Sequence, residues 1–582
     1  MLRKLARCVR EYKKPTIFTM IFIVLEAVIE ALIPFITANL INTVKQGAEV
    51  KDIVINGSIL FAMACLSLLC GGFAGLFSAK AAAGFAKNLR HDAFSKIQSY
   101  DFENIDKFSS SSLVTRLTTD ITYVQMSFMM IIRSAIRSPL MLIFSIIMSA
   151  IMGGPLALMF VVVIPVLGFG LFIIARKAMP IFRRIFKKYD KMNESVEENV
   201  RGMRVVKGFA KEGYEKEKFS KASDDICKEF TKAEKLIALN SPLMNLTMYF
   251  NMLFILFIGS SIAIKSGGTK IDVGQISAMI NYGMAVLFSL MFLSIVYVVI
   301  TMSAESARRI VEVLDEQPVL KQIDNPVKEV KNGDIVFENV SFKYKLDAEA
   351  YALMDINLNI KSGMTVGILG GTGSSKSTLV QLIPRLYDAT LGNVYVGDVN
   401  VKDYDIKALR DSVSMVLQKN QLFSGTIKDN LRWGNENATD EEIVKACKLA
   451  QADDFINSFP EKYDTYIEQG GNNVSGGQKQ RLCIARALLS KPKILILDDS
   501  TSAVDTKTDA YIRSGFKKYL PETTKLIIAQ RVASVMDADM IVVLDSGKIV
   551  ECGTHDELMK GSTIYKEVYE SQIRGGNENA KA

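Results

Sequence analysis

The hydrophobic pattern divides the chain into two halves. Up to about residue 316, long apolar runs are joined by connections that are alternately very short and very long, whereas from Ile335 onward short β-rich runs alternate with helical segments. Apolar runs of about 20 residues or more can cross a hydrocarbon core of about 30 Å. We expect six membrane spans, near residues 17–40, 53–79, 128–152, 155–175, 242–264 and 274–301. The first half is therefore predicted to be a multi-pass helical membrane domain.

The first apolar run follows a basic N-terminal stretch. It is longer than the apolar core of a signal peptide, which spans about 7–15 residues, so we interpret it as an uncleaved span with its N-terminus inside. Four apolar residues of the basic stretch recur at helical spacing, namely Leu2, Leu5, Val9 and Tyr12. This spacing favours a short helix in the cytoplasmic interface of the membrane. A plain positively charged flank is the alternative.

Basic residues are concentrated in some connections and scarce in others. The N-terminus and the connections 80–126 and 176–239 hold 6, 6 and 17 Lys and Arg residues, whereas the three short connections hold four together. Connections rich in Lys and Arg stay in the cytoplasm. Both termini and both long connections are thus predicted to be cytoplasmic.

The two long connections are predicted to be helical. In 176–239, apolar residues recur every three or four positions among charged ones, at Ile181, Ile185, Met192, Val196, Val200 and Met203. This period indicates that spans four and five continue beyond the bilayer as amphipathic helices. Each connection must then reverse far from the membrane, and we expect the reversals at 101–108 and 205–219, available to dock on another domain.

The second half has the pattern of an α/β domain with a mainly parallel sheet. A polar stretch at 317–333 separates it from the membrane domain of residues 1–316, so we place the linker there and the second domain at 334–573. The tail at 574–582 is predicted to be disordered.

Composition and charge narrow the function. Hydrophobic residues make up 49% of the 582 residues, and the net charge is +8. Residues 1–316 hold 37 Lys and Arg against 26 Asp and Glu, whereas residues 317–582 hold 33 against 36. Because the basic excess belongs to the membrane half, we expect no nucleic-acid partner. Seven cysteines without a CxxC pair indicate neither a disulfide framework nor a zinc site.

A phosphate-binding loop follows the apolar run 365–370. Its residues are Gly370, Gly371, Thr372, Gly373, Ser374, Ser375, Lys376, Ser377 and Thr378. Backbone N–H groups and a helix N-terminus in such a loop cradle phosphates, while Lys376 reaches the β and γ phosphates and Ser377 binds Mg²⁺. Ser375 stands where the pattern has its second glycine. We therefore expect ATP and Mg²⁺ as cofactors.

Further motifs follow in a fixed order. The apolar run 493–499 ends in carboxylates, where Asp498 would organise Mg²⁺. Together with the P-loop, the segment VLQKNQLFSGTI, the signature VSGGQ (474–478) and SAVD (502–505), this run resembles the nucleotide-binding domain of the ABC transporter family. Six spans followed by such a domain resemble an ABC exporter half-transporter, and the resemblance covers essentially the whole chain.

The resemblance implies roles for particular residues. Tyr344 resembles the aromatic residue that stacks on adenine, with an ordinary strand tyrosine as the alternative. Gln418 resembles the residue that contacts Mg²⁺ and the attacking water. Asp505 resembles a residue at the dimer interface. The signature resembles the helix start that contacts the γ-phosphate of ATP held by the other subunit, through Ser475, Gly476, Gly477 and Gln478.

Two catalytic positions depart from the family pattern. Asp499 stands where the family has the glutamate that acts as general base, and its side chain is one methylene shorter. Gln530 stands where the family usually has a switch histidine, and an amide cannot carry a positive charge. The chain has only two histidines, His91 and His555, and neither lies at that position. This chain's own site is thus predicted to bind ATP and hydrolyse it poorly.

The signature is intact, although the base and the switch are not. Because the family shares each nucleotide site between two subunits, we expect a heterodimer in which this chain carries a degenerate site and completes a competent site on a different half-transporter. The resemblance implies alternating access in the cell membrane. The expected partners are the second half-transporter, membrane lipid and a small amphipathic substrate.

The sequence leaves the identity of the transported compound open. Glu26 and Glu30 lie four residues apart in the first span, hence on one helix face, and either attract cationic cargo or are merely hydrated or paired beside a cavity. Arg133 and Arg137 are interpreted as anchors on the cytoplasmic side. A drug-type exporter is the leading hypothesis, a lipid or peptide exporter the second, and a nucleotide-regulated channel or regulatory subunit the third.

Overall fold

The computed structural model of the protein describes residues 2–47, 49–345, 347–499 and 505–579. The chain forms two compact units. The first, which we call the helical unit, comprises Met1–Ser99 and Phe108–Glu316. The second, which we call the α/β unit, comprises Tyr100–Lys107 and Gln317–Ala582. The polar stretch 317–333 therefore groups with the α/β unit, and so does a short insertion from the first long connection.

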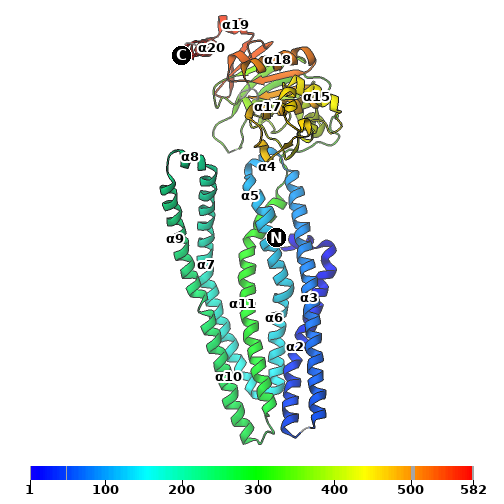
Figure 1. The fold of residues 1–582 in the computed structure, drawn as a ribbon, viewed down its shortest axis with the longest axis vertical. Helices are drawn as coiled ribbons and strands as arrows, with labels where there is room; N and C mark the ends of the chain where they lie inside the picture. The colour runs from blue at the N-terminus through cyan, green and yellow to red at the C-terminus, as the bar shows by residue number, and fades with distance from the viewer. Residues whose placement is uncertain (1, 48, 346, 500–504, 580–582) are drawn as a thin grey trace. The chain divides into compact units, whose positions relative to one another are not determined.

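The long helices of the helical unit run side by side along its length (Figure 1). In chain order the helices are α1 (Leu2–Arg7), α2 (Lys13–Lys45), α3 (Val50–Gln98), α5 (Ser110–Thr115), α6 (Ile121–Gly153), α7 (Met159–Arg201), α8 (Met203–Gly208), α9 (Glu212–Ile237), α10 (Asn240–Lys265) and α11 (Val273–Asp315). Two 3₁₀ turns, η1 (Arg10–Tyr12) and η3 (Gly154–Leu158), and one π-helical turn, η2 (Arg116–Asp120), complete the unit.

Among the described residues, five helical stretches are long and apolar enough to cross a membrane. One of them, Ser110–Arg201, contains both α6 and α7, which are joined through the five-residue turn η3. The six predicted spans therefore fall in α2, α3, α6, η3 with α7, α10 and α11. The predicted helical membrane domain is confirmed.

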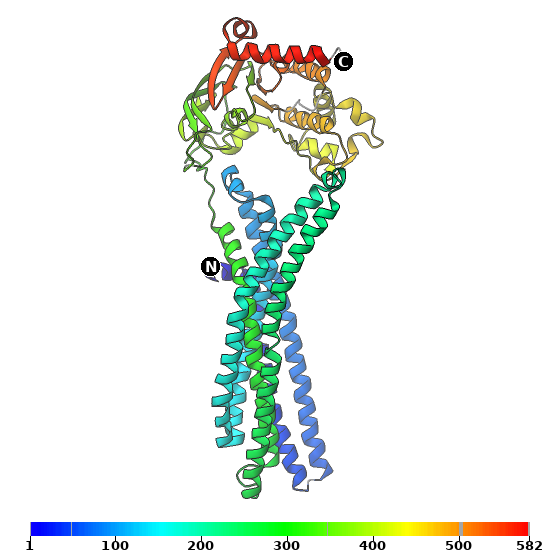
Figure 2. The ribbon, with the colours of Figure 1, turned by 90° about the vertical axis from the view of Figure 1, so that its left-hand side faces the viewer.

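The predicted extension of the spans beyond a bilayer is also confirmed. α7, which contains span four, has 43 residues, and the helical stretch Glu212–Lys265, which contains span five, has 54. At 1.5 Å per residue these lengths are about 65–80 Å, more than twice the thickness of a hydrocarbon core. α7 and α9 form an antiparallel pair whose far end, at α8, stands apart from the rest of the helical unit in both views (Figures 1 and 2). The chain reverses here between Arg201 and Glu212, which overlaps the predicted 205–219 but begins earlier.

The N-terminal stretch forms the predicted helix α1, and its apolar residues pack against protein. Leu5 and Val9 are buried in a cluster with Phe85, Leu89 and Ile310, from α3 and α11. This contact was not predicted, and the interfacial position of the helix stays a prediction. The same helical spacing serves equally well for packing against protein, and the sequence pattern does not distinguish the two.

The α/β unit contains two large sheets. The six-stranded sheet has the order β12-β11-β3-β10-β9-β6, and it is parallel except for β12. The four-stranded sheet β2-β1-β4-β5 is antiparallel. The strands are β1 (Ile335–Phe342), β2 (Leu353–Ile360), β3 (Thr365–Leu369), β4 (Leu391–Val396), β5 (Val399–Asn400), β6 (Val413–Val416), β7 (Gly425–Thr426), β8 (Tyr466–Ile467), β9 (Ile494–Asp498), β10 (Thr524–Ile528), β11 (Met540–Asp545) and β12 (Lys548–Gly553). The predicted parallel sheet is confirmed, whereas the antiparallel sheet was not predicted.

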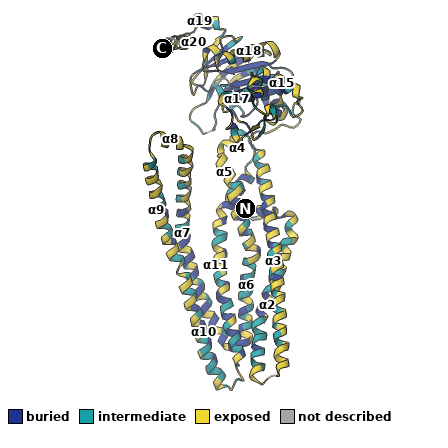
Figure 3. Ribbon diagram, viewed as in Figure 1, coloured by how far each residue is buried: buried dark blue, intermediate teal, exposed yellow. Residues whose placement is uncertain are grey.

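The parallel sheet is buried on both faces, which explains its continuous apolar runs. All residues of β9 and β10 are buried, as the dark strands in Figure 3 show. One face packs against the antiparallel sheet, and the other against helices. The helices of this unit are α4 (Phe102–Lys107), α12 (Lys376–Gln381), α13 (Ile406–Ser412), α14 (Ile427–Arg432), α15 (Asp440–Leu449), α16 (Asp453–Asn457), α17 (Gly476–Leu489), α18 (Thr506–Tyr519), α19 (His555–Gly561) and α20 (Thr563–Asn579).

The C-terminal stretch differs from the disorder expected for 574–582. Helix α20 continues to Asn579, and residues 580–582 lie outside the described residues. Tyr565, near the start of α20, is completely buried in the core of the α/β unit. The helix is therefore anchored by an apolar contact that the polar tail sequence does not reveal.

Candidate functional site

The P-loop joins the end of β3 to the start of α12, where two glycines are required. A Cβ at Gly370 would lie 2.3 Å from the carbonyl oxygen of Leu544, and Gly373 has φ +84°. Ser375 also adopts a left-handed conformation, with φ 70° and ψ 26°. For a residue with a Cβ this conformation costs roughly 1–2 kcal/mol. The loop thus keeps a backbone that favours glycine although serine occupies the position.

The Lys376 ammonium lies over the loop. Its Nζ donates to the carbonyl oxygens of Gly370 at 2.8 Å and Gly371 at 2.7 Å, and to Ser374 Oγ at 3.3 Å. Burial lowers the pKa of Lys376, and the nearby Asp498 and Asp499 carboxylates partly oppose that change. A phosphate group that enters the loop would provide stronger, charged acceptors for the same donors.

Two of the predicted Mg²⁺ ligands are in direct contact. Ser377 Oγ donates to Asp498 Oδ1 at 2.9 Å, and Asp498 lies buried at the carboxyl end of β9. Burial raises the pKa of Asp498, and the hydrogen bond from Ser377 partly opposes the rise. Hydroxyl and carboxylate oxygens are the ligands that Mg²⁺ prefers. The donor set at this position therefore fits the ion.

The three residues predicted to be catalytic also meet. Gln530 Nε2 donates to Asp499 Oδ2 at 3.1 Å. Burial raises the pKa of Asp499, and hydrogen bonds from Gln418 and Gln530 oppose the rise. Asp499 has φ 48°, so its backbone turns sharply just after β9. Instead of a glutamate beside a histidine, the site holds an aspartate bound by amides.

Tyr344 lies beside α12, the helix that follows the P-loop. Its hydroxyl is 2.9 Å from Thr378 Oγ1 in α12. The ring is packed edge-on against Phe342 and Tyr387, with centroids 4.9 and 5.4 Å away, and the residue is still 43% exposed. A fixed, partly exposed ring of this kind offers a surface on which a base can stack.

The signature residues begin the 14-residue helix α17. Ser475 is the N-cap and forms a capping box with Gln478: Ser475 Oγ accepts from the Gln478 N–H at 3.3 Å, and Gln478 Oε1 accepts from the Ser475 N–H at 2.9 Å. Gly476 and Gly477 form the first turn. A capped helix N-terminus of this kind is a favourable site for an anion.

Asp505 caps the next long helix, α18. Its side chain accepts from the Thr508 N–H at 2.9 Å, and hydrogen bonds to Thr508 hold the pKa of Asp505 below its usual value. The other positions of the SAVD motif, 502–504, lie outside the described residues. The described part of the motif is therefore a helix start, as is the signature.

Comparison with known proteins identifies the family. The ABC transporter transmembrane region matches residues 16–301, and the ABC transporter family matches residues 353–502. A Bacillus subtilis protein, the uncharacterized ABC transporter ATP-binding protein YfiB, is 37% identical over 562 residues, which cover 96% of this chain and 97% of the relative. The chain belongs to the ABC transporter family.

A second relative of this ABC transporter comes from Mycobacterium tuberculosis. The uncharacterized ABC transporter ATP-binding protein Rv1273c is 31% identical over 577 residues, 98% of each chain. The fold matches the structure of a bacterial Atm1-family ABC exporter with ATP bound, with a TM-score of 0.83 at 21% identity, covering 97% of this chain and 98% of that one. The protein is an ATP-driven half-transporter, and the predicted family, fold class and enzyme class are confirmed.

The first predicted reversal, at 101–108, belongs largely to the α/β unit of the ABC transporter, which includes Tyr100–Lys107. The Tyr387 hydroxyl donates to Asp106 Oδ2 at 2.6 Å, and Phe102 packs edge-on against the same tyrosine. Asp101 accepts from the Leu320 N–H at 2.8 Å. The prediction that the turn at 101–108 docks on another domain is confirmed, since α4 is held by Tyr387 and by the segment that follows α11.

The intramembrane carboxylates have a partner that the sequence did not indicate. Arg137 in α6 donates to both oxygens of Glu30, at 2.7 and 2.8 Å, and lies 3.6 Å from Glu26. The interpretation of Arg137 as a cytoplasmic anchor was therefore wrong. A charge at membrane depth is costly unless it is paired, and Glu30 on α2 provides the pair.

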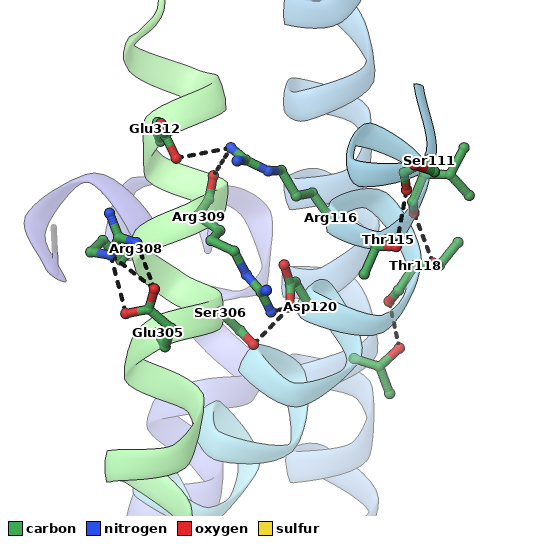
Figure 4. Close-up of polar contacts among 12 residues, drawn as sticks. Ser111, Thr115, Arg116, Thr118, Asp120, Glu305, Ser306, Arg308, Arg309 and Glu312 are labelled. Atoms are coloured by element: carbon green, nitrogen blue, oxygen red, sulfur yellow. Dashed lines mark hydrogen bonds and ion pairs between the residues drawn. The ribbon is translucent and has the colours of Figure 1, made fainter. Parts of the chain in front are cut away.

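A second polar cluster joins the turn that precedes α6 to the C-terminal part of α11 (Figure 4). Asp120, at the end of the π-helical turn η2, is fully buried, and its Oδ1 accepts from Ser306 at 2.8 Å and Arg309 at 2.5 Å. Arg116, at the other end of the turn, donates to Glu312 at 3.1 Å and to the Arg309 carbonyl at 2.9 Å. Each ion pair joins a buried or nearly buried side chain, Asp120 or Arg116, to a partly exposed one, Arg309 or Glu312. The cluster thus links η2 to α11 through four polar contacts.

Sequence reasoning missed this cluster and the contacts of Arg137. The partners lie 186 to 196 residues apart in the cluster and 107 apart in the pair. Charged residues near a helix end are usually solvated, so the presence of Arg, Asp and Glu at these positions did not indicate that they would be paired. The one available signal was Asp120 itself, a carboxylate within eight residues of a predicted span.

Proposed function

We propose that this chain is the degenerate-site subunit of a heterodimeric ABC exporter that moves amphipathic, drug-like compounds out of the cell. One observation carries the proposal. The signature begins a well-capped helix, whereas the base and switch positions of the same chain hold Asp499 and Gln530, bonded to each other at 3.1 Å. The chain can therefore complete a site on a partner better than it can hydrolyse ATP on its own P-loop.

Binding and hydrolysis have different requirements at the P-loop. Binding requires backbone N–H groups, the Lys376 charge and oxygen ligands at Ser377 and Asp498, and all of these are present. When bound there, Mg²⁺ neutralises phosphate charge. Tyr344 would stack on the adenine. These residues support retention of ATP at this site.

Hydrolysis requires a base that reaches the attacking water. The Asp499 carboxylate is one methylene shorter than a glutamate, and a misplacement of about 1 Å can lower a rate on the order of 10²-fold. The hydrogen bond from Gln530 also occupies one oxygen of the Asp499 carboxylate. Gln530 can donate to a γ-phosphate but provides no positive charge there. Both features support slow hydrolysis at this site.

The tip of the second cytoplasmic hairpin supports a partner subunit. Around α8, the exposed apolar residues Val205, Phe209 and Tyr214 are 62%, 73% and 64% exposed. Such a cluster of exposed apolar residues marks an interaction site more often than a free surface. We assign it to the nucleotide-binding domain of the second half-transporter, while Asp505 would lie at the interface between the two ATPase domains.

The expected orientation places both termini and the nucleotide-binding domain in the cytoplasm, because the basic residues are concentrated there. Closure of the two ATPase domains on ATP would be transmitted through the α4 and α8 reversals to produce alternating access. ATP drives this only through its higher affinity for the closed arrangement. ATP retained at the degenerate site would keep the domains associated between cycles.

Two measurements test the proposal. The purified chain alone should bind ATP and release phosphate slowly, and co-purification with a half-transporter that has glutamate and histidine at the two altered positions should restore rapid hydrolysis. Inside-out vesicles containing both chains should take up a cationic dye in the presence of ATP. Robust ATPase activity from the chain alone would refute the degenerate site. ATP-gated ion currents without dye uptake would favour a channel instead.

A further inference from the structure

Gln530 is held from behind by a residue of the last helix. Gln572 in α20 donates its Nε2–H to the carbonyl oxygen of Gln530 at 2.9 Å, and its Oε1 accepts from the Val532 N–H at 2.8 Å. One carboxamide thus pairs with a C=O and an N–H two residues apart, as a neighbouring strand would. Both bonds lie on the segment that presents the Gln530 side chain to Asp499.

The two backbone groups that Gln572 binds fall between two regular structures. The ladder of β10 ends where the Ala529 N–H donates to the Ile368 carbonyl at 3.2 Å. The 3₁₀ turn η7 (Val532–Ser534) then uses the carbonyl of Arg531, which accepts from the Ser534 N–H at 3.1 Å. The turn also engages the carbonyl of Val532, which accepts from the Val535 and Met536 N–H groups at 2.9 Å. The Gln530 carbonyl and the Val532 N–H belong neither to the β10 ladder nor to the turn bonds of the described residues. The Gln572 side chain binds both groups.

Helix α20 is itself firmly anchored, which makes Gln572 a fixed point. Tyr565 is completely buried, and its hydroxyl is 2.7 Å from His555 Nδ1 in α19. Val568 and Tyr569 pack against the same core. The spacing of 565, 568, 569 and 572 places all four residues on one face of the helix. The face that packs on the core therefore also directs Gln572 at the switch segment.

The switch segment is also bound by α18. Ser534 Oγ donates to Asp509 Oδ2 at 3.2 Å, and the Asp509 side chain is only 7% exposed. Asp509 lies one turn after Asp505, the N-cap of α18. Two helices, α18 and α20, thus contact the segment that carries Gln530.

We propose that Gln572 is a positioning residue for nucleotide recognition: its carboxamide fixes the switch segment so that the Gln530 amide faces Asp499 and the γ-phosphate of ATP on this chain's P-loop. The inference rests on the proposed role of Gln530. Gln572 lies outside the P-loop, the signature and the switch motif. Its two hydrogen bonds connect the C-terminal helix α20 to the nucleotide site.

The first test is hydrogen exchange in the full-length chain without nucleotide. Gln572→Met keeps the length of the side chain but has neither donor nor acceptor, and because Gln572 is exposed the fold should persist. Ser571→Ala, on the exposed neighbour, is the matched control. We expect amide exchange in the 529–535 peptide to become on the order of tenfold faster in Gln572→Met and to stay unchanged in Ser571→Ala.

The second test is equilibrium binding of Mg²⁺-ATP and Mg²⁺-ADP to the same variants. Only ATP has the γ-phosphate, so the ratio of the two dissociation constants reports on Gln530. We expect Gln530→Ala to weaken ATP binding on the order of tenfold and Gln572→Met about threefold, with ADP binding unchanged in both. Ser571→Ala should retain the wild-type ratio.

The outcomes separate the inference from the proposed function. Unchanged exchange in Gln572→Met overturns the inference, and so does faster exchange with an unchanged ATP-to-ADP ratio. If Gln530→Ala leaves that ratio unchanged, Gln530 does not read the γ-phosphate and the inference fails with it. Rapid hydrolysis by the wild-type chain alone would refute the degenerate site, while the exchange result would still decide whether Gln572 holds the segment.

Discussion

The two nucleotide-facing surfaces of this chain differ in kind. The signature surface is a helix start with both members of its capping box in place, whereas the P-loop surface combines a strained serine, a short carboxylate and an uncharged amide. Both surfaces can hold phosphate, because backbone N–H groups and a lysine suffice for that. Only hydrolysis demands a side chain of the right length. The contrast shows how a chain can retain ATP on one surface and complete catalysis through the other.

The largest expected effect comes from the signature. Gly477→Asp places a carboxylate at the start of α17, where the γ-phosphate held by the partner would lie. We expect the ATPase rate of the co-purified heterodimer to fall by about 10²–10³-fold, measured as steady-state phosphate release. Gly561→Asp is the control, because a Cβ there meets no atom within 4 Å. A heterodimer that retains its rate with Gly477→Asp would show that this signature completes no catalytic site.

The second effect concerns the P-loop surface. Asp499→Glu combined with Gln530→His restores the reach of the base and a group that can be protonated at the switch. In a heterodimer whose partner has its own catalytic glutamate replaced by glutamine, we expect the double variant to raise phosphate release on the order of 10²-fold. Asp499→Asn with Gln530→His should give no gain. If ATP binds but the double variant stays at the background rate, the two positions do not account for the degenerate site.

A smaller effect follows from the buried carboxylate at the Mg²⁺ position. Burial raises the pKa of Asp498 in the folded state, so the folded chain binds this proton more readily than the unfolded chain. Stability from this group therefore falls as pH rises through the folded pKa, and it is recovered as pH falls. Asp498→Asn removes the dependence. As the pH is lowered without nucleotide, the midpoint of thermal unfolding should therefore shift in favour of wild type relative to the variant.

The single tryptophan, Trp433, makes this measurement specific to the α/β unit, because its ring is stacked on Phe423 there at 4.2 Å. Tryptophan fluorescence therefore reports on the unfolding of the α/β unit, because the helical unit contains no tryptophan. Parallel pH curves for wild type and Asp498→Asn would show that this carboxylate has the same pKa in the folded and unfolded chains, which would contradict the argument from burial.

The smallest effect is expected at Ser375. Replacing it with glycine removes the strain of the left-handed conformation, although the added freedom of the unfolded chain offsets part of the gain. We expect Ser375→Gly to raise the free energy of unfolding of the α/β unit by at most about 1 kcal/mol, measured by Trp433 fluorescence in urea. Ser375→Ala keeps the Cβ and should give no gain. Equal stabilisation by both variants would mean that serine imposes no strain.

Much of the fold and of the nucleotide site could be predicted from the sequence, because both depend on local patterns. Apolar runs of about 20 residues identify spans, and the P-loop, signature and strand-end carboxylates have fixed spacing along the chain. The structure brings Gln418, Asp499 and Gln530 together as expected. The antiparallel sheet was missed. β2 does alternate apolar and polar residues, but nothing in the sequence indicates that β1 pairs with both β2 and the distant β4.

Local patterns in the chain suffice to predict which chemistry is present: six spans, a phosphate loop, an intact signature, and an aspartate and a glutamine in place of a base and a switch. Which charges and amides meet depends on how the helices and strands pack. Arg137 faces Glu30, Asp120 is buried against Arg309, and Gln572 reaches the switch segment. The physical reason is that a buried polar group must find a partner wherever packing places one, and packing joins residues that are far apart in the chain.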